Sequence, residues 1–410
     1  MDQTAQRRRE RWAVLALTLG AFAMAVNSQV MAALLPFVPA HLAPDKAAQG
    51  TLAASAGFAG AVGSLLLGPW VDRVGRRPPL LLGMAVFSLA SLLHCVAATQ
   101  GTLLAARALA GFAVGVAYTS ASAAVADLVP YERRGAAMGV FHAGLFLATP
   151  VGLPVANAFA VAGAWRGTFA VQAIFGLATL VAVLAVLPSG TGRAGTRSSF
   201  GTLVRQPMVV PVLLAVLLAT GGFFAFVQFV GVWLDESGIV GRQRQAWLWI
   251  GLGLASAGGS VLLGRAVDRF GKRAFVLWTT GVLAVLLGAF AWVRDLPTLL
   301  AVGLPMTIVA AARTSAFQAL ASELVAAPMR GALMGARSAA VQLGQGAFLQ
   351  AGGAVYAAHG FAGFLWLSVA GVAVSYVLVR AFVTEIPMVG GDAALDTTAA
   401  AAEDRGDGLR

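Results

Sequence analysis

Long apolar runs recur along the whole chain and are separated by short polar segments. We count twelve, at about 12–38, 49–70, 79–98, 101–125, 135–158, 166–187, 208–234, 245–265, 274–293, 298–321, 331–355 and 362–384. An α-helix rises about 1.5 Å per residue, so a run of about 20 residues spans the roughly 30 Å hydrocarbon core of a bilayer. The pattern predicts an all-α integral membrane protein with twelve transmembrane helices.

Composition and charge support this interpretation. Of the 410 residues, 59% are hydrophobic and 11% are charged, whereas a soluble domain has about 25% charged residues. The net charge of +11 could suggest nucleic acid, but twenty of the 28 basic residues fall on one side of the predicted membrane, five on the other and three inside spans. The positive-inside rule then places both termini and the middle loop in the cytoplasm. The excess of Arg over Lys hints at a bacterium, so we expect a multi-pass protein of the bacterial inner membrane, embedded in lipid, with no nucleic-acid partner.

A ten-residue pattern occurs twice, 196 residues apart. The first copy runs from Gly68 to Arg77 and the second from Gly264 to Arg273, and the same offset relates 134–139 to 330–335. A fixed offset over separate stretches indicates two homologous halves of the same topology, which is the plan of many transporters. We expect an N-terminal six-helix bundle over 1–187, a cytoplasmic linker over 188–207, a C-terminal six-helix bundle over 208–385 and a disordered cytoplasmic tail over 386–410.

The duplicated pattern resembles the loop signature of the major facilitator superfamily, found between helices two and three and between helices eight and nine. Arg107, four residues before Gly111, resembles the superfamily's fourth-helix motif. The segments 152–155 and 165–169 resemble the drug and sugar efflux branch of twelve-helix proton antiporters, although Ala156 stands where that branch has glycine. The resemblance implies two pseudo-symmetric six-helix bundles. It also implies secondary active transport of a small organic solute by alternating access, with efflux in exchange for protons.

The residues of the repeated loop can be explained by their physical chemistry. Gly68 and Gly75 permit a tight turn, and Asp72 suits a helix N-terminus, where the dipole favours an anion. The resemblance implies that Asp72 faces the eleventh helix and, by the repeat, that Asp268 faces the fifth, which would hold the cytoplasmic side closed; alternatively, these charges only mark topology and anchor loops. The predicted gating set is Gly68, Asp72, Arg73, Gly75, Arg76, Asp127, Arg134, Gly264, Asp268, Arg269, Gly271, Glu323 and Arg330.

The charges predicted inside the membrane are cationic. All 17 acidic residues fall in loops, tails or span ends. Multidrug exporters of the resembled branch commonly keep a carboxylate on the first helix, where this chain has Asn27-Ser28-Gln29. Arg313 lies near the middle of the tenth span, where an ionised side chain needs a water-filled cavity or a partner such as a backbone carbonyl. Arg107 and Arg337 lie about two turns from a span end, so snorkelling is an alternative for them. These features favour a polar or anionic substrate over a cationic drug.

Polar residues accompany these cations. Gln342 and Gln345 follow Ser338 at i, i+4 and i+7, and Thr314 and Gln318 form a similar stripe on the tenth span. Such stripes indicate either a cavity or hydrogen bonding between helices. His142, close to the repeat position of Arg337, titrates near physiological pH and is a candidate proton carrier, although a structural role is the alternative. The predicted substrate cavity comprises Asn27, Gln29, Arg107, Tyr118, His142, Gln228, Arg313, Thr314, Gln318, Arg337, Gln342 and Gln345.

The sequence also argues against several other classes of function. The spans show no cluster of nucleophile, base or metal ligands, so we expect neither an enzyme with catalytic residues nor a metal or other cofactor. Cys95 is the only cysteine, which excludes an intrachain disulfide. A membrane sensor is a further class, but it should carry an extra ordered domain. The expected partners are a small-molecule substrate and protons, and a monomer suffices. Uptake or facilitated exchange of an organic anion is the alternative function.

Overall fold

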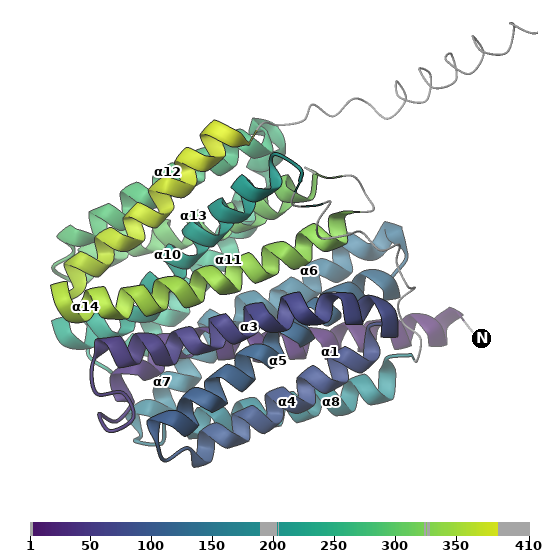
Figure 1. Ribbon diagram of the computed structural model, residues 1–410, viewed down its shortest axis with the longest axis horizontal. Coiled ribbons are helices and arrows are strands. Elements are labelled where there is room, and N and C mark those ends of the chain that lie inside the picture. Colours follow the sequence, from purple (N-terminus) through teal and green to yellow (C-terminus); the bar gives the residue numbers. More distant parts are fainter. Residues whose placement is uncertain (1–2, 189–202, 204, 324, 326–328, 384–410) are drawn as a thin grey trace, which may run out of the picture.

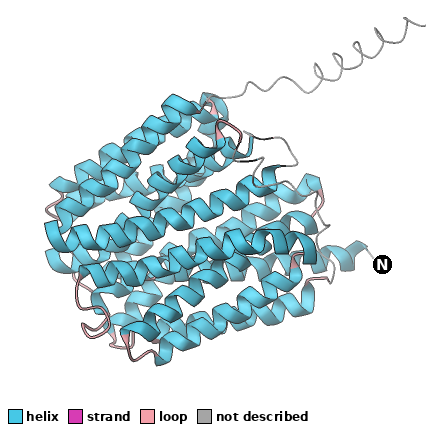
Figure 2. Ribbon diagram, viewed as in Figure 1, coloured by secondary structure: helices cyan, strands magenta, loops and turns pink. Residues whose placement is uncertain are grey.

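The computed structural model describes residues 3–188, 203, 205–323, 325 and 329–383. Side chains at 3–6, 66–73, 131–132, 134–136, 260–262, 264–269, 319, 322–323 and 330–331 lie outside this description, as do most of the predicted linker and the predicted tail. The described residues form helices joined by short connections and contain no strand (Figure 2).

The first half of the chain supplies six membrane-length helical segments. Their parts are α1 (Gln3–Gln29), α2 (Met31–Leu34), η1 (Leu35–Phe37), α3 (Lys46–Val74), α4 (Arg77–Val96), α5 (Gln100–Leu128), α6 (Tyr131–Leu147), η2 (Ala148–Gly152), α7 (Leu153–Val161) and α8 (Gly167–Val186). The segment η2 is a π-helix that joins α6 to α7. The second half contains α10 (Val209–Ser237), α11 (Gln245–Phe270), α12 (Lys272–Ala289), η3 (Phe290–Trp292), α13 (Leu296–Glu323) and α14 (Arg330–Phe382).

The helices match the twelve predicted spans. Nine stretches of the described residues are long and apolar enough to cross a membrane, and one of them, α14, makes two spans. It does so because Gly360 has non-helical dihedral angles, φ 67° and ψ −174°, within α14. The remaining two spans are α3 and α11, with 29 and 26 residues. The prediction of an all-α membrane protein with twelve spans is confirmed.

The repeat is visible in the backbone. Gly75 ends α3 with φ 83°, and Gly271, 196 residues later, ends α11 with φ 80°. A positive φ is unfavourable for residues with a Cβ, so glycine at these two positions allows the sharp connection to the next helix. The starts of α5 at Gln100 and of α13 at Leu296 show the same offset.

The helices run from one end of the molecule to the other, with the two halves side by side (Figure 1). We call the end with the connections near Gly75, Pro130 and Gly271 the basic end. The opposite end, with the connections near Lys46 and Gly241 and the break at Gly360, is the Lys46 end. The orientation of these two ends in the membrane stays a prediction.

Glycines bring the two halves together where α3 packs against the first part of α14. A Cβ on Gly57 would lie 2.7 Å from the backbone nitrogen of Gly346, and a Cβ on Gly50 would lie 2.6 Å from the carbonyl oxygen of Leu349. Helices in lipid associate through small residues that allow the backbones to approach closely. These glycines all lie in the half of the bundle toward the Lys46 end, so the two halves meet tightly there.

Candidate functional site

Polar contacts between the two halves gather at the Lys46 end. The ammonium group of Lys46, at the start of α3, lies 2.6 Å from Oε1 of Glu236, near the end of α10. Tyr356 of α14 donates a hydrogen bond to Oε2 of the same carboxylate, and the Lys46 ammonium lies 5.5 Å from the centre of the Tyr356 ring. We call Lys46, Glu236 and Tyr356 the latch. It joins the first half of the chain to two helices of the second.

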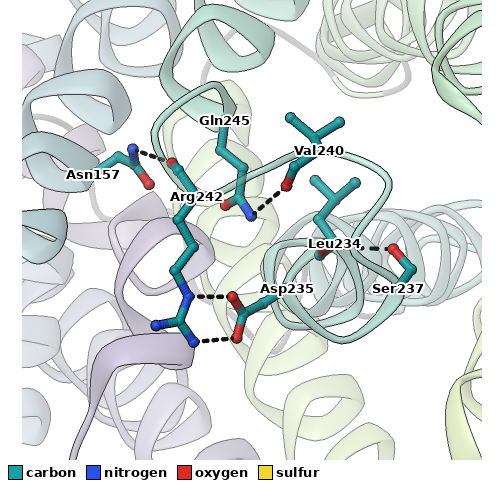
Figure 3. Close-up of polar contacts among 7 residues, drawn as sticks. All are labelled: Asn157, Leu234, Asp235, Ser237, Val240, Arg242 and Gln245. Atoms are coloured by element: carbon teal, nitrogen blue, oxygen red, sulfur yellow. Dashed lines mark hydrogen bonds and ion pairs between the residues drawn. The ribbon is translucent and has the colours of Figure 1, made fainter.

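A second cluster at this end is built on Arg242, in the connection between α10 and α11 (Figure 3). Its Nη2 donates a 2.7 Å hydrogen bond to Oδ2 of Asp235, and hydrogen bonding to this carboxylate raises the pKa of Arg242. Its guanidinium carbon lies 5.0 Å from the centre of the Phe37 ring, and its carbonyl oxygen accepts a 3.0 Å hydrogen bond from Nδ2 of Asn157. Phe37 and Asn157 belong to the first half, so Arg242 also bridges the halves.

Two further contacts close the interface deeper in the bundle. Gln228 of α10 donates a 2.7 Å hydrogen bond to the carbonyl oxygen of Ser28, at the end of α1. Three residues later, Gly231 packs so closely on α2 that a Cβ there would overlap the carbonyl oxygen of Ala32. The predicted cavity residue Gln228 therefore lies at the junction of the halves, where it ties α10 to α1.

A pocket lies between the halves, next to these contacts. Its empty volume is about 310 Å³, including the open solvent at its mouth. Asn27, Arg107, Gln342 and Gln345 all line it, together with Ser28, Phe224 and other apolar side chains. Four residues of the predicted cavity, from α1, α5 and α14, are thus brought together.

Arg107 is 1% exposed, so it does not snorkel to a membrane surface. Its Nη1 donates a 3.2 Å hydrogen bond to the carbonyl oxygen of Asn27, whose Nδ2 in turn donates a 2.8 Å bond to Oε1 of Gln172 on α8. The sequence did not lead us to predict a role for Gln172, although a glutamine within a strongly apolar span indicates a buried polar contact. This chain of contacts fixes Arg107 at the wall of the pocket.

Arg313 and Arg337 form a second cationic cluster. Arg313 is 3% exposed, and its Nε and Nη1 have no hydrogen-bond partner among the described residues. Arg337 lies within electrostatic range of Arg313. It also interacts electrostatically with Tyr118 of α5 and His142 of α6. We call these four residues the arginine cluster, and it takes side chains from both halves.

The remaining predicted cavity residues lie outside both the pocket and the arginine cluster. Gln29 accepts a 2.7 Å hydrogen bond from the hydroxyl of Thr149 in η2, within the first half. Thr314 is exposed, and its hydroxyl bonds to the carbonyl oxygen of Ala310 in its own helix. Gln318 is half-buried. A histidine outside the predicted set, His94, is also buried, and its ring is stacked 4.2 Å from that of Phe169, which fits a structural role.

Most of the predicted gating set lies outside the described side chains. This applies to Gly68, Asp72, Arg73, Arg134, Gly264, Asp268, Arg269, Glu323 and Arg330. Among the others, Nε of Arg76 lies 3.2 Å from Oδ2 of Asp127, and this ion pair joins α5 to the α3–α4 connection within the first half. The gating role of the basic end stays a prediction. The described residues include no group of three or more His, Cys, Asp or Glu side chains placed to hold a metal ion.

Comparison with known protein families settles the class of this protein. The family model described as Major Facilitator Superfamily matches residues 17–259 and 240–397. The chain belongs to this superfamily. Superfamily membership and the twelve apolar spans identify it as a membrane transporter of small molecules rather than an enzyme.

Known members of the superfamily resemble the chain over much of their length. It is 28% identical over 290 residues to the uncharacterized MFS-type transporter YwfA of Bacillus subtilis, covering 68% of this chain and 69% of that protein. It is 28% identical over 263 residues to a probable sugar efflux transporter of Helicobacter acinonychis, covering 63% and 67%. A crystal structure of a D-xylose–proton symporter superposes with a TM-score of 0.74 at 19% identity, covering 91% of this chain and 98% of the other, and shows the shared fold.

Proposed function

We propose that this protein is a secondary active transporter that exports a polar organic anion in exchange for protons. Alternating access requires a site between the two halves and closure of one end at a time. The pocket and the arginine cluster are the candidate site between the halves. The contacts at the Lys46 end close one end of the bundle. Export is proposed from the resemblance to the efflux branch and from relatives named as probable sugar efflux transporters.

The observation that carries the anionic substrate is Arg313. Its guanidinium is buried, and two of its nitrogens lack a hydrogen-bond partner among the described residues. A second guanidinium, that of Arg337, lies within electrostatic range and repels it. A buried cation is unfavourable without an anionic partner, and a bound carboxylate or phosphate would supply one.

The distribution of basic residues leads us to propose that the basic end faces the cytoplasm. Both termini are then cytoplasmic, and the closed Lys46 end faces the outside of the cell. With the Lys46 end closed, a substrate would have to reach the arginine cluster from the cytoplasm, as export requires.

Uptake or facilitated exchange of an organic anion is the second candidate. It is favoured by the absence of any acidic residue near the middle of a predicted span, since a buried carboxylate is a common proton carrier in transporters. His142, beside Arg337, is the group that we propose to carry the proton if transport is proton-coupled.

Thermal stability and transport together test the proposal. Ligands that bind the folded protein raise its melting temperature, so organic anions, cations and neutral solutes are compared on the wild type, Arg313→Ala and Arg313→Lys. An anion should raise the melting temperature of the wild type, leave that of Arg313→Ala unchanged and raise that of Arg313→Lys only slightly. The control Arg294→Ala, in an exposed loop, should respond as the wild type does. Counterflow of that anion into liposomes, with and without a pH gradient, then separates proton exchange from anion exchange. Stabilisation by lipophilic cations, unchanged in Arg313→Ala, would overturn the anionic substrate.

A further inference from the structure

We infer that the pocket between the two halves binds a single chloride ion, held by the guanidinium group of Arg107 and by the side-chain amides of Gln342 and Gln345. The inference goes beyond the proposed function, because this ion is a second ligand and not the transported solute. Neither Arg313 nor Arg337 lines this pocket, so the ion site does not depend on the arginine cluster.

Arg107 is a buried cation without a charged partner among the described residues. It is 1% exposed. Its Nη1 donates hydrogen bonds of 3.2 Å and 3.5 Å to the carbonyl oxygen and to Oδ1 of Asn27, and both acceptors are neutral. Its Nε is buried and has no hydrogen-bond partner among the same residues. A cation inside a membrane-spanning bundle is unfavourable unless an opposite charge lies next to it.

The carboxylates of the described residues do not supply this charge. Arg107 takes part in none of their ion pairs. Along the helices that line the pocket, the nearest acidic residues are Asp45 and Glu236. Asp45 lies eight residues before Ala53, the first lining residue of α3, which is about 12 Å along the helix axis. Glu236 lies twelve residues after Phe224 of α10, or about 18 Å.

The second half contributes unused amide groups to the same pocket. Gln342 and Gln345 lie about one helical turn apart on α14, so they share a face, and neither side chain makes a hydrogen bond to another described residue. A Cβ on Gly60 would lie 2.2 Å from Nε2 of Gln342 and 3.1 Å from the carbonyl oxygen of Gly111. Because Gly111 follows Arg107 by one turn on α5, this free amide group lies beside the helix that carries the cation.

The size of the pocket favours a monatomic ion. It has room for a group of about the size of one water molecule, and its other walls include small or apolar residues such as Ala53, Gly57 and Val114. A carboxylate or a phosphate with its substituents is too large for this space. Chloride is only slightly larger than water, carries the missing negative charge and accepts N–H hydrogen bonds from several directions. A water molecule would fill the space but would leave the charge of Arg107 uncompensated.

An ion at this position joins the two halves. Arg107 belongs to α5 in the first half, whereas Gln342 and Gln345 belong to α14 in the second. The ion has all its donors only while these helices lie together. Chloride should therefore stabilise the folded protein in the conformation described here.

Melting temperatures in two salts test the site. The full-length protein in detergent is measured in sodium chloride and in sodium methanesulfonate, whose anion is too large for the pocket, at equal ionic strength. Because a ligand of the folded state raises the melting temperature until it saturates, chloride should give the wild type a saturable rise of a few degrees. Arg107→Gln should melt at the same temperature in both salts. The control Arg294→Gln removes an exposed arginine, makes the same change in net charge and should respond as the wild type does.

Two further measurements keep the test decisive if Arg107→Gln does not fold. Gln345→Leu, which lacks one donor, should need about tenfold more chloride for half of the rise, since it loses one hydrogen bond to a charged group. Crystals of the wild type soaked in sodium bromide should show an anomalous peak within hydrogen-bonding distance of the Arg107 guanidinium and the two amides. A bromide peak at any other position, with none in the pocket, would overturn the site.

The failure of this site and the failure of the proposed function are distinguishable. Equal melting temperatures of the wild type in the two salts would overturn the chloride site and leave the organic anion standing, because that anion is tested through Arg313. A chloride response that persists in Arg107→Gln and disappears in Arg313→Ala would assign the ion to the arginine cluster. That result would also overturn the pocket site.

Discussion

Replacing Glu236 by glutamine should open the Lys46 end. The change keeps the size of the side chain and removes the charge that pairs with Lys46. It also turns the oxygen that accepts the Tyr356 hydrogen bond from a carboxylate into a neutral group. The ion pair with Lys46 exists only while the two halves are together at this end, so its loss should favour the conformation in which this end is open. The Tyr356 hydrogen bond joins α10 to α14 within the second half and is present in both conformations.

The size of the effect follows from the exposure of the groups. The Lys46 and Glu236 side chains are 26% and 46% exposed, and partly exposed ion pairs contribute roughly 0.2–1 kcal/mol. The Tyr356 hydrogen bond is weakened as well, but it lies between two helices of the second half, so it does not enter the balance between the closed and open states. The substitution should therefore shift the balance between the closed and open states by roughly 0.2–1 kcal/mol, which changes the ratio of closed to open about 1.4- to 5-fold.

Distances between spin labels measure this ratio. Gly101 and Gly241 lie at the Lys46 end, one in each half, and a Cβ at either position meets no other atom within 4 Å. Cysteines introduced there, in a Cys95→Ala background, carry the labels. Pulsed electron resonance on Glu236→Gln should show a larger fraction of long distances than on the parent protein.

Asp295→Asn is the matched control. Asp295 lies at the same end and accepts a 2.9 Å hydrogen bond from the backbone nitrogen of Thr298, at the start of α13. Asparagine caps a helix equally well, so this variant removes a carboxylate without touching a contact between the halves. Identical distance distributions for Glu236→Gln, Asp295→Asn and the parent would refute the latch and leave closure to glycine packing alone.

Three further substitutions test the packing and the basic end. Gly231→Val should force α10 away from Ala32 and reduce cross-linking between cysteines placed on either side of the Lys46 end. Gly111→Ala should lower the melting temperature by several degrees, because its Cβ would overlap the carbonyl oxygen of Ala56 between α3 and α5; an unchanged melting temperature would contradict this packing. Asp72→Asn should slow or abolish transport while the protein still folds, and normal transport kinetics would refute the gating role of the repeated loop.

The fold could be predicted from the sequence because bilayer thickness fixes the length of each span and the repeat fixes the topology. Most helices begin and end close to their predicted runs, although α1 begins at Gln3, well before the predicted start at about residue 12, and the turns at Gly75 and Gly271 fall where the repeat places them. The break at Gly360 was visible only as a gap between two apolar runs. The π-helix η2 was not predicted, since its geometry depends on the packing of α6 and α7 against α1 and α11.

The side-chain contacts of the site could not be predicted, because they join residues that lie far apart in the chain. Glu236 meets Lys46 and Tyr356 across 190 and 120 positions, and Asn27 meets Gln172 across 145. No local pattern marks such partners. The sequence could show that an ionised group in a span needs a partner or a cavity, and it left both alternatives open for Arg107 and Arg313. In the structure Arg107 has its partner in Asn27, whereas Nε and Nη1 of Arg313 find none among the described residues.

The two halves differ at each of the buried arginines. Shifted by 196 residues, Arg107 corresponds to Gly303, Arg313 to Ala117 and Arg337 to Phe141. The repeat therefore accounts for the helices and their connections, while each cation is a departure from it. Arg313 and Arg337 both belong to the second half, and Tyr118 and His142, which interact electrostatically with Arg337, belong to the first. An anion bound there would add a contact between the two halves. Its binding energy would then favour closure of the basic end, which is the step that alternating access requires after loading.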